Sequence, residues 1–161
     1  MSQPLRIGIA GLGTVGIGVI KILRNKVELL RQRTGRKLVI TAVSARDPRK
    51  DRGVVVSDYA WESDPVALAQ RDDVDIFVEL IGGHDGPALE ATKAALAAGK
   101  DVVTANKAML AHFGHELATM AEEKATLIRF EAAVAGGIPV IKSLTEGLAG
   151  NQISRVMGVM N

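Results

Sequence analysis

The stretch GLGTVG at residues 11–16 decides the fold, because it joins a strand-like run at residues 5–10 to a pattern of helical spacing. Gly11, Gly13 and Gly16 stand in the order G-x-G-x-x-G. In a turn of this kind the first glycine permits a tight bend, the second lets a diphosphate approach the backbone, and the third lets the helix pack closely on the strand. The stretch therefore predicts a nucleotide-binding turn at the end of the first strand.

The helix predicted to begin near Thr14 supplies the donors that such a turn needs. The first N–H groups of a helix lack partners within it, and the helix dipole makes this end partly positive. We expect the backbone at Thr14 and Val15 to help hold the diphosphate, with no cationic side chain required. The predicted packing face of this helix consists of Gly16, Ile20, Leu23, Val27 and Leu30.

Strand-like and helix-like segments alternate after this turn. Further strands are predicted at residues 37–45, 54–56, 74–81, 101–105 and 127–134. Further helices are predicted after Asp64-Pro65 and at residues 87–98, 109–124 and 139–148. This alternation predicts an α/β fold with a doubly wound parallel sheet, a Rossmann-like dinucleotide-binding domain, over residues 1–150.

Residues 151–161 contain one more strand-like run, at residues 153–160, which is expected to begin a missing substrate domain. Catalysis by a dinucleotide enzyme requires that the substrate be held against the nicotinamide ring. We therefore expect this chain to be the cofactor-binding part of a larger enzyme, and we expect it to be inactive when isolated.

Composition limits the classes of function that remain. Hydrophobic residues make up 47% of the 161 residues and aromatic residues only 3%, which predicts one domain with an aliphatic core. The net charge is +2 and the charges are interleaved, so no nucleic-acid partner is expected. The lack of cysteine excludes disulfides and fits a cytoplasmic protein. No apolar run reaches membrane-spanning length, so no membrane partner is expected.

The residues after the second predicted strand indicate which dinucleotide is bound. An acidic residue at this point binds the ribose 2′-hydroxyl of NAD, whereas an arginine accommodates the 2′-phosphate of NADP. Arg46 comes first here, Asp47 follows, and Lys50 is close behind. A guanidinium binds phosphate bidentately, and an ammonium adds a point charge. We therefore favour NADP with Arg46 and Lys50 as ligands, and binding of NAD through Asp47 is the alternative.

Two further signals follow the strands predicted at residues 74–81 and 101–105. Gly82 is expected to let the backbone approach the nicotinamide ribose. The stretch TANK at residues 104–107 ends on Lys107, at the same edge of the sheet. A lysine beside the nicotinamide end of the crevice can contact a polar substrate oxygen and take part in proton transfer. A solvated lysine at the start of a helix is the alternative interpretation.

Three stretches together resemble the nucleotide-binding half of homoserine dehydrogenase, namely GLGTVG, TANK and EAAVAGGIPVI at residues 131–141. The resemblance covers essentially the whole chain. It implies the reduction of aspartate 4-semialdehyde to homoserine with NAD(P)H, on the shared route to threonine, methionine and isoleucine. It also implies that Lys107 lines the active site near the nicotinamide and the substrate, and that Arg46 and the glycine turn contact the cofactor. The intact enzyme is expected to be a homo-oligomer.

The same resemblance implies a monovalent cation, expected to be sodium, at the hinge between two domains. Its ligands would be the side chain of Glu131 and the backbone carbonyls of Val134, Gly136 and Ile138. Oxygen donors of this kind suit a hard cation. The alternative interpretation is that Glu131 caps a helix, or serves as a hinge carboxylate, without any ion.

Two other functions stay open on the sequence alone. A non-catalytic dinucleotide-sensing module would need the glycine turn, but it has no use for Lys107 and Glu131 at the same edge. Another two-domain NAD(P)-dependent dehydrogenase, acting on an amino or sugar carbonyl, would share the fold.

The second catalytic lysine and the substrate-binding acids of the resembled family lie beyond the residue that matches Asn161. The complete acid–base pair is therefore not contained in this sequence.

Overall fold

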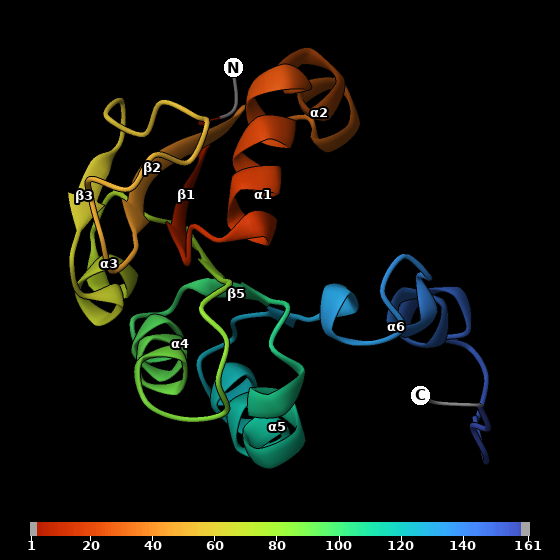
Figure 1. Cartoon of the computed structure of the whole chain (residues 1–161). Helices are drawn as coiled ribbons and strands as arrows, with labels where there is room; N and C mark the ends of the chain where they lie inside the picture. Colours follow the sequence, from red (N-terminus) through yellow and green to blue (C-terminus); the bar gives the residue numbers. More distant parts are fainter. Residues whose placement is uncertain (1–2, 159–161) are drawn as a thin grey trace.

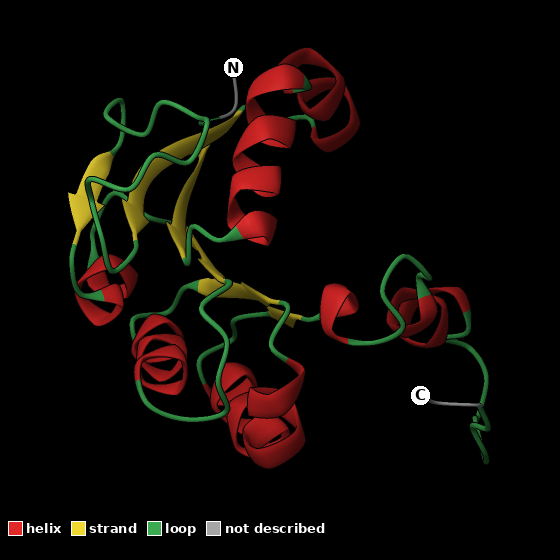
Figure 2. Cartoon of the chain, viewed as in Figure 1, coloured by secondary structure: helices red, strands yellow, loops and turns green. Residues whose placement is uncertain are grey.

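Six parallel strands form one sheet in the computed structural model of the chain, which describes residues 3–158 (Figure 2). The strands are β1 (Leu5–Ala10), β2 (Leu38–Ser44), β3 (Ala60–Glu62), β4 (Ile76–Glu79), β5 (Asp101–Thr104) and β6 (Ile128–Arg129). They lie in the order β3-β2-β1-β4-β5-β6. The direction of winding reverses between β1 and β4, which is where ligands bind in sheets of this kind. The predicted doubly wound parallel sheet is thus confirmed.

Helices cover both faces of this sheet (Figure 1). One face carries α1 (Thr14–Asn25) and α2 (Val27–Thr34), and the other carries α3 (Pro65–Gln70), α4 (Pro87–Ala97) and α5 (Lys107–Glu123). After β6 the chain forms η1 (Glu131–Ala133), α6 (Val140–Lys142) and η2 (Ser143–Gly147). This last part extends away from the sheet, as the blue end of the ribbon shows (Figure 1).

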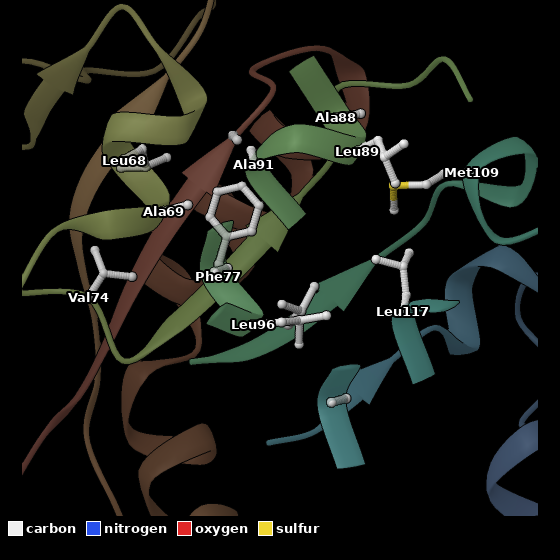
Figure 3. Packing of buried hydrophobic residues seen from close by; sticks show 14 of the residues in the cluster. Leu68, Ala69, Val74, Phe77, Ala88, Leu89, Ala91, Leu96, Met109 and Leu117 are labelled. Atoms are coloured by element: carbon white, nitrogen blue, oxygen red, sulfur yellow. The ribbon is translucent and has the colours of Figure 1, made fainter. Parts of the chain in front are cut away.

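The buried side chains form two clusters, one on each face of the sheet. The cluster under α3, α4 and α5 is built around Leu68, Phe77, Leu96, Met109 and Leu117 (Figure 3). The cluster under α1 is built around Ile7, Ile9, Ile20, Ile40 and Val43. Phe77 is the one aromatic residue among the buried core residues that the structure describes, so the core is aliphatic, as the composition predicts.

The third strand lies later in the chain than predicted. Residues 54–56 form a loop, and β3 begins at Ala60. Gly53 has a φ of +64°, and its N–H donates to Asp51 Oδ1 at 2.9 Å, so the chain turns just before the apolar residues. The prediction was wrong because local apolar character does not show which segment finds a partner strand.

The first predicted helical face is divided between two helices. α1 ends at Asn25, Lys26 leaves the helical region with φ −119° and ψ 23°, and α2 begins at the next residue. No residue of α2 is buried, so Val27 and Leu30 do not continue the packed face of α1, contrary to the prediction. Asparagine is a weak helix former because its side chain competes for nearby backbone groups, which favours a break at this point.

The last predicted elements are shorter in the structure. The strand predicted at residues 127–134 is present only as the two residues of β6, at the edge of the sheet beside β5. The helix predicted at 139–148 is present as α6 followed by the π-helical η2. Residues 153–158 pair with no strand in the described part of the chain, and residues 159 and 160 lie outside it. A strand needs a neighbour for its backbone hydrogen bonds, and apolar alternation does not supply one.

The close packing of α1 on the glycine turn gives a stability prediction. A β-carbon on Gly16 would lie 2.0 Å from Gly11 O, whereas one on Gly18, in the same helix, would have no protein atom within 4 Å. We expect Gly16→Ala to lower the free energy of unfolding by about 1–3 kcal/mol through overpacking. Gly18→Ala should instead raise it by roughly 0.5–1 kcal/mol through helix propensity. Urea denaturation followed by circular dichroism measures both, and equal stability of the two variants would contradict the packing role of Gly16.

Candidate cofactor-binding site

The glycine turn lies where the carboxyl ends of β1 and β4 meet. Gly11 N–H donates to Ser44 O at 2.9 Å, and Leu80 N–H donates to Ala10 O at 2.7 Å, so the turn is bound to both neighbouring strands. Gly11 has a φ of +98°, and a β-carbon on it would lie 2.2 Å from Leu80 O. Position 11 therefore requires glycine on two independent grounds, backbone conformation and space.

The other two glycines of the turn have different surroundings. Gly16 faces the carbonyl of Gly11, and the lack of a side chain there lets α1 pack against the turn. A β-carbon on Gly13 would meet nothing within 4 Å, because this residue faces open space. Gly13 is also the N-cap of α1 and offers no side chain to occupy the first N–H groups of the helix. A diphosphate can thus reach these donors, which is the fit that a dinucleotide requires.

Two hollows flank the turn. The first, of about 420 Å³, lies between the start of α1 and the loop after β2, and Thr14 and Lys50 are among its lining residues. The second, of about 170 Å³, lies between the start of α1 and the ends of β4 and β5, and Val15 and Gly82 are among its lining residues. The structure therefore distributes the predicted glycine turn, Lys50 and Gly82 along one edge of the sheet.

The loop after β2 is held in shape by Arg52. Its Nη1 donates to Lys50 O at 2.7 Å and its Nη2 donates to Asp47 O at 2.5 Å. The guanidinium carbon lies 5.6 Å from the centre of the Trp61 ring, a cation–π contact. Arg52 thus bonds the loop through both of its terminal nitrogens, and it closes residues 47–52 into a compact turn beside the first hollow.

The predicted cofactor-selecting side chains lie on this loop in different settings. Lys50 lines the first hollow, whereas Arg46 is exposed and is not among the residues that line it. Asp47 Oδ1 accepts a hydrogen bond from Arg49 N–H at 2.8 Å, which engages one carboxylate oxygen in the turn of the loop. The structure therefore brings Lys50 to the hollow and leaves Arg46 exposed, two residues after the end of β2.

Lys107 is the first residue of α5, which begins two residues before the helix start predicted at residue 109. Asn106 is the N-cap of this helix, and its Oδ1 accepts from Met109 N–H at 3.1 Å. Ala105 and Asn106 line the second hollow, whereas the Lys107 side chain is exposed and does not line it. Lys107 therefore directly follows two residues that line the second hollow, and it is itself exposed.

A buried acid at the end of β4 was missed by the sequence reasoning. Glu79 is completely buried, and its Oε1 accepts from Ile81 N–H at 2.7 Å and from Gly82 N–H at 3.2 Å. Its Oε2 accepts from the Thr104 hydroxyl at 2.5 Å. The signal was present in the sequence, because Glu79 is an acidic residue inside an otherwise apolar run at residues 76–81.

Glu131 caps a helix. Its Oε1 accepts from Ile141 N–H at 3.0 Å and its Oε2 accepts from Lys142 N–H at 2.9 Å, both at α6. This confirms the capping contact that was the alternative to an ion ligand. The predicted carbonyl ligands Val134, Gly136 and Ile138 lie on the exposed turn between Glu131 and α6. Within residues 3–158 there is no cluster of three or more acidic, histidine or cysteine side chains suited to a metal ion.

The clearest pKa shifts belong to the opposite edge of the sheet. A hydrogen bond from Arg71 lowers the pKa of Asp73, and one from Arg6 lowers the pKa of Asp75. Burial lowers the pKa of Lys100, whose ammonium donates to Arg71 O. Arg6, Asp75 and Lys100 lie at the amino ends of β1, β4 and β5, and the ion pair of Arg6 with Asp75 joins the first two of these strands. They are structural and do not mark a second site.

Comparison with known proteins agrees with the geometry of this edge. The family model described as "Homoserine dehydrogenase, NAD binding domain" matches residues 11–131. The homoserine dehydrogenase of Neisseria gonorrhoeae is 46% identical over 159 residues, which are 99% of this chain and 36% of the relative. That of Pseudomonas aeruginosa is 42% identical over 161 residues, with 99% and 36% covered. This chain therefore spans little more than a third of the length of these relatives.

Solved structures give the same result. A homoserine dehydrogenase from Thiobacillus denitrificans superposes with a TM-score of 0.85 at 40% identity, over 93% of this chain and 35% of that protein. The S. aureus homoserine dehydrogenase superposes with a TM-score of 0.78 at 36% identity, over 86% and 34%. None of the helices described in residues 3–158 has the length and hydropathy to cross a bilayer. The chain has an oxidoreductase cofactor-binding role for a nicotinamide dinucleotide, and it belongs to the homoserine dehydrogenase family as the NAD-binding part.

Proposed function

We propose that this chain is the cofactor-binding part of an NAD(P)-dependent homoserine dehydrogenase, which interconverts aspartate 4-semialdehyde and homoserine by hydride transfer. The observation that carries the proposal is the open backbone at Gly13, placed at the switch point between β1 and β4 by Gly11 and Gly16. Two relatives named homoserine dehydrogenase align with 99% of this chain, and their names support this reaction. The same coverage favours this reaction over a dinucleotide sensor or a different two-domain dehydrogenase.

The two hollows support a placement in which each receives one end of the cofactor. The N–H groups at the start of α1 would hold the diphosphate, and Lys50, together with the exposed Arg46, would bind the adenosine 2′-phosphate of NADP. Gly82 and Val15 would then face the nicotinamide end in the second hollow. When bound, the nicotinamide supplies or accepts the hydride. NAD is the alternative, with the remaining oxygen of Asp47 on the ribose.

Lys107 would act on the substrate beside the nicotinamide. Lys107 begins α5 directly after two residues that line the second hollow, and its ammonium would hold the aldehyde oxygen there and help pass a proton to the resulting alkoxide. The residues that hold the remainder of the substrate would come from a second domain, which we propose begins at residues 151–161. We also propose that the intact enzyme is a homo-oligomer, and the cytoplasmic location stays a prediction.

The turn after β6 would hold a monovalent cation, with sodium as the expected ion. Each carboxylate oxygen of Glu131 accepts one N–H donor from α6 and keeps acceptor capacity for another partner. Together with the carbonyls of Val134, Gly136 and Ile138, this makes a donor set of oxygen atoms only, which suits a hard cation. The ion would stiffen the connection between the sheet and the rest of the protein.

Arg46 and Lys50, on the loop after β2, lead to a prediction about the preference for NADPH over NADH. NADPH should bind this chain more tightly than NADH, and Arg46→Ala should weaken NADPH by about 1.5–3 kcal/mol, the usual value of a hydrogen bond to a charged group. NADH affinity should change little, because it lacks the 2′-phosphate. Isothermal titration calorimetry measures both, with Arg33→Ala on the exposed surface of α2 as the control. Equal affinities for the two cofactors in the unsubstituted chain would contradict NADP preference.

The 161-residue chain should bind cofactor without catalysing the reaction. Holding the substrate against the nicotinamide is worth roughly 7–11 kcal/mol of the activation barrier, and we expect the residues that do so to belong to the second domain. NADPH oxidation with aspartate 4-semialdehyde, followed by absorbance, should therefore stay at background in a preparation that binds NADPH. Turnover comparable to that of a full-length relative would show that no second domain is required.

Lys107 should separate catalysis from cofactor binding. In a longer protein that includes the substrate domain, Lys107→Ala should lower kcat by about 10²–10⁴, the usual range for an acid–base group. NADPH affinity should change far less, because the diphosphate and 2′-phosphate are held elsewhere. Steady-state kinetics tests this, with Lys124→Ala at the other end of α5 as the matched control. Unaltered turnover would make Lys107 a solvated residue, and loss of cofactor affinity alone would make it a binding group.

A further inference from the structure

The buried carboxylate at the end of β4 has a complete set of partners. Glu79 has no exposed surface, and an isolated carboxylate in such a place would be strongly unfavourable. Three donors compensate it, which are the N–H groups of Ile81 and Gly82 and the hydroxyl of Thr104. Two of these donors belong to the loop that follows β4, and the third belongs to the neighbouring strand β5. Glu79 therefore joins the ends of two strands and the loop between β4 and α4.

The contacts continue to the start of α5. The Thr104 hydroxyl, which donates to Glu79, also accepts from Asn106 N–H at 3.0 Å. Asn106 Nδ2 donates to Gly83 O at 2.6 Å, while its Oδ1 caps α5 through Met109 N–H. The hydrogen bonds thus form a closed ring, from Glu79 through Thr104 and Asn106 to Gly83 and back along the loop to Glu79.

The loop inside this ring, residues 81–83, makes its side-chain hydrogen bonds with Glu79 and Asn106, and the imidazole ring of the next residue, His84, lies 4.9 Å from that of His112 in α5. Gly82 and Gly83 have φ values of +84° and +85°, and neither carries a side chain that could pack. Both are exposed, so the side chains of Glu79 and Asn106 set where the backbone of the loop lies. Glu79, Gly82 and Asn106 also line the second hollow.

We propose that Glu79, Thr104 and Asn106 are positioning residues. They hold the loop at residues 81–83 and the start of α5 in the positions that binding of the nicotinamide half of the cofactor requires. The proposal rests on the proposed function, because it takes a nicotinamide dinucleotide as the ligand. These residues act through others. Glu79 and Asn106 fix the backbone of Gly82 and Gly83, and Thr104 and Asn106 fix the helix that Lys107 begins.

The chemistry of the ring determines which substitutions preserve it. The hydroxyl of Thr104 donates to a carboxylate and accepts from a backbone N–H at the same time, which serine can also do and valine cannot. Serine at position 106 can still cap α5, but it is too short to reach Gly83 O. Thr92 offers a matched control, because it is also completely buried and its hydroxyl has no hydrogen-bond partner among the described residues.

The test compares two nucleotides on the 161-residue chain. NADPH contains the nicotinamide half, whereas adenosine 2′,5′-bisphosphate lacks it. Asn106→Ser and Thr104→Val should lower the affinity for NADPH about threefold to tenfold, which is the effect of one lost hydrogen bond. The affinity for the bisphosphate should stay within about twofold of that of the unsubstituted chain. Thr104→Ser and Thr92→Val should bind both nucleotides like the unsubstituted chain. Fluorescence titration gives the affinities, and circular dichroism establishes that each variant is folded.

Three results would overturn the proposal. Unchanged NADPH affinity in Asn106→Ser, or equal weakening of both nucleotides, would reduce the ring to a structural support. The same holds if Thr104→Ser loses as much NADPH affinity as Thr104→Val. If Thr104→Val does not fold, Asn106→Ser decides alone, because it keeps the helix cap. Failure of the unsubstituted chain to bind either nucleotide would overturn the proposed function itself, which separates that failure from failure of the ring.

Discussion

The close approach of Gly11 to Leu80 is the constraint on which the rest of the binding edge depends. A side chain at position 11 would collide with the backbone of the chain leaving β4, and the φ of +98° would be strained for any other residue. Because this contact holds the turn between β1 and β4, α1 starts at the point where the strand order of the sheet reverses. Its unoccupied N–H groups then face the crevice, with one hollow on each side.

The two sides of the crevice are built in different ways. On the side of β2, a loop closed by Arg52 presents charged side chains to solvent, and its shape depends on hydrogen bonds within the loop. On the side of β4 and β5, backbone and buried polar groups form the wall, and the ring through Glu79 fixes them. In the function that we propose, charge selects the ligand on the first side, whereas the position of backbone groups matters on the second. The ion pair of Arg6 with Asp75 ties the amino end of β1 to the start of β4, and neither residue lines either hollow.

Local patterns predicted the parts of the site that depend on a few consecutive residues. The glycine turn is of this kind, because its geometry is set by glycine spacing. The helix after β5 was also predicted, although it begins at Lys107, two residues earlier than expected, because Asn106 caps it. The prediction of a strand at residues 54–56 was wrong, because the tertiary fold decides which segment pairs with β2, and that segment is β3. Glu79 was missed for the same reason, since its partner Thr104 lies 25 residues later in the chain and the contact arises only when β4 and β5 pair. For Glu131 the sequence left capping and ion binding open, and the structure confirms the cap alone.

The pair of left-handed glycines at positions 82 and 83 has a consequence for how such a protein can diversify. Any L-amino acid there would strain the backbone, and changes at Glu79 or Asn106 would release the same loop, so this wall tolerates few mutations. The loop at residues 46–50 tolerates more, because all five of its residues are exposed and none belongs to the buried core. If this loop selects the dinucleotide, as we propose, evolution can change which dinucleotide is accepted while the opposite wall of the crevice stays the same.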